Sequence, residues 1–149
     1  MSDYVADIIT EMESIIVATV SAEWNKLPFV HDLAKNSKRT TRFAYGVRPL
    51  AANTAEGGIV RAYTLDHFFE VILTDTITNR GSDDPITTSL GILYDVADDI
   101  FKELVNSKVN LPLVVLSVSE PSMQQPEIIE SAKIVALRLQ LKVKYRGNL

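Results

Sequence analysis

The chain has 149 residues, of which 46% are hydrophobic and 23% charged, so we expect residues 1–149 to form a single globular domain with a sizeable core. The net charge of −4 excludes a general attraction to nucleic acid or anionic membrane, and the absence of cysteine excludes disulfides, thiolate metal sites and cysteine nucleophiles. With no recognisable signal peptide and no apolar run of the ~18–20 residues that span a bilayer, we expect an intracellular protein without a membrane partner.

The first predicted element is a helix that begins at Ser2 and is closed off by Pro28. Ser2 is a favourable N-cap, and apolar residues recur from Val5 to Trp24 at steps of three and four, which predicts one buried helix face. Residues 26–42 show no period and are interpreted as a connecting loop with room for one helical turn. The loop carries the basic residues Lys35, Lys38, Arg39 and Arg42.

A β-hairpin is predicted next. Its first strand is Phe43–Leu50, which Pro49 ends or confines to a sheet edge, and the small and polar residues of Ala51–Gly58 predict the hairpin tip. The return strand is Ile59–Thr78. One of its faces carries His67, Phe69, Val71 and Leu73, and the other carries Asp66, Phe68, Glu70 and Ile72. Because both faces are partly apolar, we expect more than one helical layer to cover this strand.

The second half repeats the order of helix, strand and strand. Asp84 and Pro85 are a favourable N-cap and first residue for a helix. The predicted core stripe of this helix is Ile86, Leu90, Leu93, Val96, Ala97, Ile100, Phe101, Leu104 and Val105. Its predicted acidic outer side is Asp95, Asp98, Asp99 and Glu103. A short strand, Leu113–Ser119, and a connection over residues 120–131 follow.

Ala132–Arg146 alternates almost without interruption and predicts a last, unusually long strand. Its apolar row is Val135, Leu137, Leu139, Leu141, Val143 and Tyr145. About fifteen residues would extend ~50 Å at ~3.3 Å per residue, whereas a chain of this length forms a body about 40 Å across. We therefore expect this strand and Ile59–Thr78 to overhang, to leave part of the apolar row in water in a monomer, and to pair with another chain.

The predicted fold class is α+β, in the order α-β-β-α-β-β, with a mainly antiparallel sheet, helices packed on it and long overhanging strands. No catalytic, cofactor-binding or metal-binding set is recognisable in it. His31 and His67 are interpreted as structural histidines, and no HExxH, phosphate-loop, GxGxxG or GxSxG motif is present. The aspartates of the second helix lie on one element, which favours a solvated or partner-facing side over a metal site. We expect no cofactor and no enzymatic activity.

Basic residues on one face of the last strand admit two interpretations. Arg138, Lys142 and Lys144 either pair with acidic groups on neighbouring strands or subunits, or contact a nucleic-acid backbone. Because the net charge is negative and no aromatic platform lies among them, sequence-specific nucleic-acid binding is not expected. Pairing between subunits is the favoured interpretation.

The order of elements is similar to that of a known family. The chain begins with a helix of about twenty residues that has Trp24 near its end, followed by a polar loop. Then come the strand Thr64–Asp75 (TLDHFFEVILTD), a helix after a short acidic loop, and an alternating C-terminal strand. This layout resembles the tail terminator (tail completion) proteins of long-tailed bacteriophages over nearly the whole chain. Related neck and head-closure proteins have a similar size and also form rings.

The resemblance implies a function in virus assembly. Proteins of that family are α+β domains that form hexameric rings, cap the growing tail tube, halt its polymerisation and provide the surface that joins the head. The implied partners are further copies of the chain, a tail tube protein and head-connector or neck proteins, with DNA passing through the lumen without sequence-specific binding. The implied location is the tail or neck of a virion, after assembly in the host cytoplasm. The family has no catalytic residues.

Sequence and resemblance together predict an interface between subunits or with tail and neck partners. Its predicted residues are Phe68, Phe69, Arg138, Lys142, Lys144, Asp95, Asp98 and Asp99. The charge split suits such an interface, since the acidic helix of one copy would complement the basic strand face of its neighbour. The alternatives to a tail terminator are a neck or head-closure ring protein and a small nucleic-acid-binding α+β module, with an enzyme third.

Overall fold

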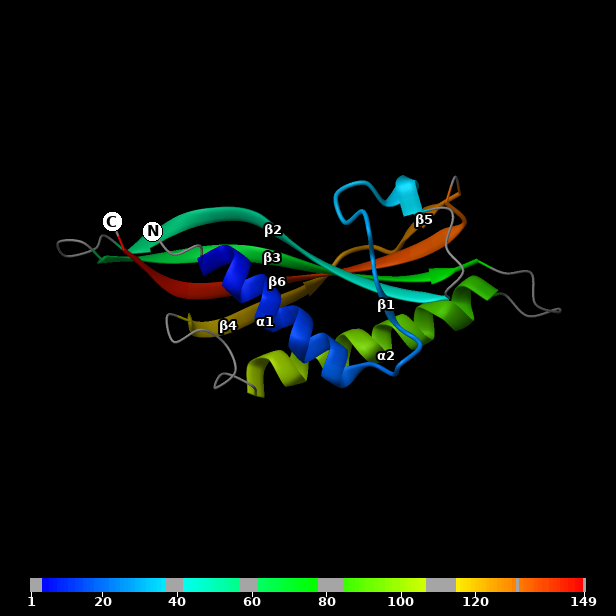
Figure 1. Ribbon diagram of the computed structural model, residues 1–149, viewed down its shortest axis with the longest axis horizontal. Helices are drawn as coiled ribbons and strands as arrows, with labels where there is room; N and C mark the ends of the chain where they lie inside the picture. The colour runs from blue at the N-terminus through cyan, green and yellow to red at the C-terminus, as the bar shows by residue number, and fades with distance from the viewer. Residues whose placement is uncertain are drawn as a thin grey trace.

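The computed structural model describes residues 4–36, 42–56, 62–77, 85–106, 115–130 and 132–148. Two helices, α1 (Tyr4–Thr19) and α2 (Pro85–Asn106), lie on one face of a six-stranded sheet (Figure 1). The predicted α+β class and the order of helix, strands, helix, strands are confirmed.

The sheet is built around its two longest strands, β3 (Ala62–Thr76) and β6 (Ile134–Asn148), which pair antiparallel along their whole length. β2 (Phe43–Glu56) flanks β3, and β4 (Val115–Met123) flanks β6. Two short strands complete the sheet: β1 (Asn25–Lys26), parallel to β2, and β5 (Glu127–Ile129), antiparallel to β6. β3 and β6 have 15 residues each, and the strands run past the start of α1 (Figure 1), as expected of overhanging strands.

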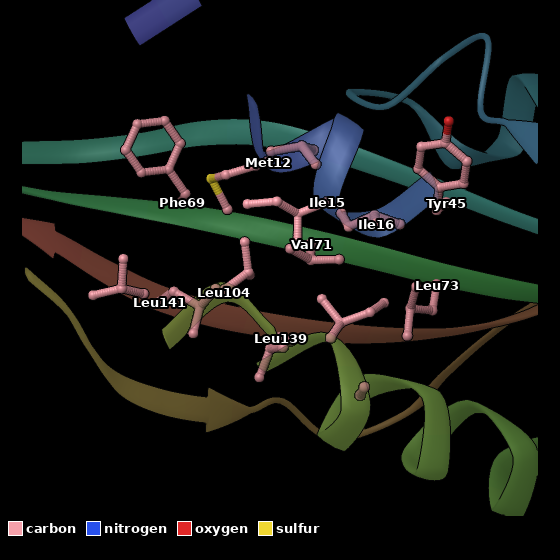
Figure 2. Packing of buried hydrophobic residues seen from close by; sticks show 14 of the residues in the cluster. Met12, Ile15, Ile16, Tyr45, Phe69, Val71, Leu73, Leu104, Leu139 and Leu141 are labelled. Carbon is pink, nitrogen blue, oxygen red and sulfur yellow. The ribbon is translucent and has the colours of Figure 1, made fainter. Parts of the chain in front are cut away.

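The main core lies between the two helices and the sheet (Figure 2). Met12, Ile15 and Ile16 of α1 and Leu104 of α2 point at the apolar row of the central strands. The prediction that this row is partly in water in a single chain is wrong: its six residues, Val135 to Tyr145, are at most 4% exposed. Packing of the two helices and of Val118 from β4 on this face keeps the row buried as far as Tyr145.

A second, smaller core covers part of the opposite sheet face. Leu27 and Leu33, the latter in a 3₁₀ turn (Leu33–Asn36), pack on Ala44, Ile72 and Ala136. This layer confirms that more than the helices covers β3, and it confirms the helical turn expected in the loop.

The loop of the second core lies so close to β2 that one position there requires glycine. A Cβ added at Gly46 would come within 2.5 Å of Val30 Cγ1, nearer than real carbon atoms approach. Gly46 therefore lets residues 27–36 lie flat on the sheet.

Several predicted boundaries are corrected. α1 ends at Thr19 and not near Pro28, because the chain turns there and Trp24 stacks on Phe43 with ring centroids 4.9 Å apart. β2 continues past Pro49 to Glu56, so the predicted tip at Ala51–Gly58 is wrong for its first six residues.

Both outer strands tolerate proline because they lie at sheet edges. β1 pairs only with Ala44 and Tyr45, so at Pro49 no outer neighbour needs the missing N–H. β4 likewise extends through Pro121 to Met123, beyond the predicted end at Ser119, and β5 falls within the predicted connection. α2 begins at Pro85 as predicted, whereas Ser2, Asp84 and residues 57–61 lie outside the described residues.

Candidate interaction surface

The sheet face opposite the helices is only half covered by the loop of residues 27–36. On the remaining half, which we call the open face, most described side chains keep partial exposure. Strand alternation and register place these side chains on it: Arg48, Asp66, Phe68, Glu70, Ser117, Ser119, Arg138, Gln140, Lys142, Lys144 and Arg146. A charged sheet face of this kind, set against a covered apolar face, is typical of an antiparallel sheet with one side in contact with water.

A chain of ion pairs crosses the open face near its middle. The buried carboxylate of Glu70 accepts hydrogen bonds at Oε1 from Arg48 Nε and Arg138 Nη1, each at 2.8 Å. Arg138 Nη2 also lies 3.2 Å from Glu127 Oε2. Arg48 and Arg138 thus neutralise acidic groups of their own chain. For Arg138, this is the pairing with a neighbouring strand that is one of the interpretations of the sequence.

Beyond these ion pairs the open face is basic. Lys142, Lys144 and Arg146 follow one another on β6, opposite Phe68, Asp66 and Thr64 of β3, and we call them the basic stripe. Asp66 lies directly opposite Lys144 in this register, and its Oδ1 is buried without a hydrogen-bond partner among the described residues. Among the side chains whose positions are described, Lys144 and Arg146 face the single carboxylate of Asp66, which leaves this part of the open face positive.

The two adjacent phenylalanines of β3 have different environments. Phe68 lies part-exposed on the open face, with Lys142 as its register partner. Phe69 is 0% exposed and packs in the main core (Figure 2). The prediction of Phe69 as an interface residue is therefore corrected, because alternation turns its side chain toward the helices.

The helical side of the molecule is acidic. Asp95, Asp98 and Asp99 are exposed on α2, as predicted.

A groove runs between the two helices, and we call it the α1–α2 groove. It is lined by Glu11, Ser14, Ile15, Ala18, Thr19, Asp99, Lys102 and Glu103. Lys102 Nζ is engaged by Asp98 at 2.8 Å, and that hydrogen bond raises the pKa of Lys102. The carboxylates of Glu11, Asp99 and Glu103 make the groove net negative.

The histidines occupy unlike positions. His31 is exposed in the loop, whereas His67 is 7% exposed and lies on the same face of β3 as Phe69, with the two ring centroids 4.5 Å apart. His67 Nε2 lies 3.0 Å from the carbonyl oxygen of Leu50, so Nε2 carries the hydrogen, and the neutral ring accepts at Nδ1 from the Tyr145 hydroxyl at 3.2 Å. Burial lowers the pKa of His67, although the Leu50 carbonyl opposes this shift. Such a satisfied ring is a structural histidine.

A buried carboxylate that the sequence did not reveal anchors one end of the sheet. Asp75, 0% exposed, binds Arg42 through both carboxylate oxygens, at 3.0 and 3.2 Å, and accepts a hydrogen bond of 2.6 Å from Ser89 Oγ. Arg42 also lies over the ring of Phe43, 4.6 Å from its centroid. This set ties β3, α2 and the residue before β2 together, so one residue of the expected basic loop is structural.

No group of three or more His, Asp or Glu side chains in the described part of the chain is placed to hold a metal ion. Within the same residues, no helix has the length and apolar character that crossing a membrane would require.

Comparison with known proteins gives a likeness of fold. No protein-family model matches the chain, and no curated protein matches it. Among solved structures, a chain from the virion of a native gene transfer agent (GTA) particle superposes with a TM-score of 0.53 at 10% sequence identity. The superposition covers 99% of this chain and 100% of that chain. The fold described above, over essentially its whole length, is therefore also the fold of a chain in a gene transfer agent virion.

Proposed function

We propose that this protein is a structural component of a virion, a single domain that forms a ring at the head-proximal end of a tail. There it would stop polymerisation of the tail tube and provide the surface that joins the head. The observation that carries the proposal is the end-to-end likeness of fold to a chain of a gene transfer agent virion. The layout shared with tail terminator proteins supports the finer role.

The distribution of charge supports assembly into a ring. The helical side is acidic, and the open face on the other side of the sheet is basic beyond its ion pairs. Two unlike surfaces on opposite sides suit a head-to-tail contact, which closes into a ring or grows into a filament. The number six rests on the resemblance to tail terminators and on the symmetry expected of a tail tube.

The proposed partners follow from this position in the particle. They are further copies of the chain, a tail tube protein on one side of the ring and head-connector or neck proteins on the other. DNA would pass through the lumen without sequence-specific binding, as suits a chain with net charge −4. The role requires no cofactor and no catalysis, and the ring would assemble in the host cytoplasm before becoming part of the virion.

Two other functions remain as candidates. A neck or head-closure protein would form a similar ring one position nearer the head. A small nucleic-acid-binding module is favoured by one observation, the run of Lys142, Lys144 and Arg146 on a partly exposed face. Binding through such a stripe would weaken steeply as the salt concentration rises.

Deletion of the gene in a host that produces the particle separates these roles. Loss of a tail terminator leaves tubes of uncontrolled length that do not join heads. Loss of a neck protein leaves tails of normal length beside separate heads. Particles of normal morphology after deletion, together with tight duplex binding by the purified protein, would favour the nucleic-acid-binding module.

A further inference from the structure

We propose that the α1–α2 groove of one copy receives the basic stripe and Phe68 of the next copy. This inference rests on the proposed function for its partner, a second copy of the chain. It goes beyond that function by naming the two surfaces that meet and by excluding the sheet edges from the contact.

Charge complementarity is the first argument. The groove presents Glu11, Asp99 and Glu103, whereas the open face presents Lys144 and Arg146. Opposite charges facing each other across an interface fix its orientation and suppress a contact between like faces. A copy would therefore not bind its neighbour through two open faces or through two grooves.

Shape is the second argument. One wall of the groove is made of the short side chains of Ser14, Ala18 and Thr19, with the nearly buried Ile15 among them. A wall of small residues leaves space for a large side chain of a partner. Phe68 is an aromatic residue of the open face, part-exposed opposite Lys142. An aromatic anchor in a groove rimmed by charges is the usual arrangement of a binding hot spot.

The sheet edges are built against the competing contact, strand-to-strand pairing. β2 carries Pro49 and an irregularity between Pro49 and Ala52, and β4 carries Pro121 within an irregularity between Ser119 and Ser122. Proline and bulges at an edge prevent another strand from adding to it. Contact between copies is thus directed to the faces of the layers and not to the edges.

Cysteine cross-linking tests the pairing directly, because the chain contains no cysteine of its own. Ala18→Cys places a thiol in the groove, and Lys144→Cys places one on the open face. The two lie on opposite sides of the sheet, so they are not able to bond within one molecule. Mild oxidation of the double variant A18C/K144C is expected to give a ladder of covalent multimers that reducing agent collapses.

The controls use matched positions. Ala34 is also an exposed alanine, but it lies in the 3₁₀ turn away from the groove, so A34C/K144C should give no ladder. Neither A18C nor K144C alone should form more than traces of dimer. An equal ladder in the control, strong dimers from one single variant, or no ladder from A18C/K144C would overturn the pairing.

Charge reversal provides a second test that does not depend on thiols. K144E/R146E and D99K/E103K should each weaken self-association about tenfold or more, and thermal melting should show that each variant remains folded. Mixed in equal amounts, the two variants should assemble again, since each reversed surface then meets its complement. Unchanged association of either variant, or no recovery on mixing, would contradict the pairing.

These outcomes distinguish the inference from the function on which it rests. A wild-type protein that assembles but does not cross-link through these positions refutes the pairing and leaves the virion role standing. A wild-type protein that stays monomeric refutes the pairing as well, while the particle phenotype on gene deletion still decides the role.

Discussion

Arg138 and Glu70 are 68 residues apart in the sequence, yet Arg138 Nη1 donates to Glu70 Oε1 at 2.8 Å. The same oxygen accepts a hydrogen bond from Arg48 Nε, so one buried carboxylate holds the three central strands together on the open face. This arrangement fixes the middle of the face, and the basic stripe that we propose as the contact for a neighbouring copy lies beyond it.

Glu70→Gln should lower the free energy of unfolding by about 3 kcal/mol, because it removes the anion that two partly buried arginines share. Denaturant unfolding followed by circular dichroism measures the change. Glu127→Gln is the matched control: the Glu127 side chain is 51% exposed, and its pairing with Arg138 should contribute less than about 1 kcal/mol. Equal losses in the two variants would show that Glu70 does not organise the face.

Asp75→Asn should be among the most destabilising polar substitutions, at about 3–5 kcal/mol, since it removes the charge that Arg42 pairs with and replaces one of the two acceptor oxygens by a donor in a fully buried position. Ser89→Ala removes only one hydrogen bond and should cost about 1 kcal/mol. Chemical denaturation of both variants gives the comparison. A small effect of Asp75→Asn would mean that the carboxylate is not needed as an anion there.

The core stripe of α2 predicts a sharp contrast between neighbouring positions. Leu93 is 0% exposed, so Leu93→Ala should cost about 2–5 kcal/mol. Asp95 is exposed on the same helix, and Asp95→Ala should change stability by less than about 0.5 kcal/mol. Melting curves of the two variants test the helix orientation, and similar losses would contradict it.

His67 should make stability depend on pH in the mildly acidic range. Its pKa in the folded chain lies below the ordinary value of 6.5, so the unfolded chain binds the proton more readily. The stability that this residue contributes is therefore complete above pH ~6.5 and is lost as the pH falls from there through the lowered pKa of the folded state.

Denaturant unfolding at a series of pH values measures this effect as the difference between wild type and His67→Gln. The variant is expected to be less stable at neutral pH, because the hydrogen bonds to Tyr145 and Leu50 change. The difference in the free energy of unfolding between wild type and His67→Gln should become smaller as the pH falls. A constant difference from pH ~7 to pH ~5 would show that burial does not disfavour the protonated ring.

Local pattern predicted the elements of this fold well. The alternation of Ala132–Arg146 and the Pro85 start of α2 depend on neighbouring residues, and both are present in the structure. The coverage of the apolar row was not predictable, because it depends on where two helices lie along a sheet. Whether a strand lies at the edge of a sheet also depends on residues far away in the sequence. Pro49 was therefore interpreted as the possible end of a strand, although β2 continues through it.

The candidate surface was predictable only in outline. The exposed aspartates of α2 and the basic residues of β6 follow from periodicity, and so does the separation of Phe68 from Phe69 onto opposite faces. Which of the two faces is buried does not follow from periodicity alone. The partners of Arg138 and Arg42 were hidden because they come from distant strands, and the α1–α2 groove exists only once both helices are in place.

Ring formation through unlike surfaces should be visible in the mass of the purified protein in solution. Light scattering coupled to size-exclusion chromatography, run from micromolar to near-millimolar protein in low and moderate salt, is the measurement. We expect a discrete species of six times the 16.5 kDa of one chain, weakened by added salt because the contact is charged. A species of 16.5 kDa at every concentration and salt would contradict it.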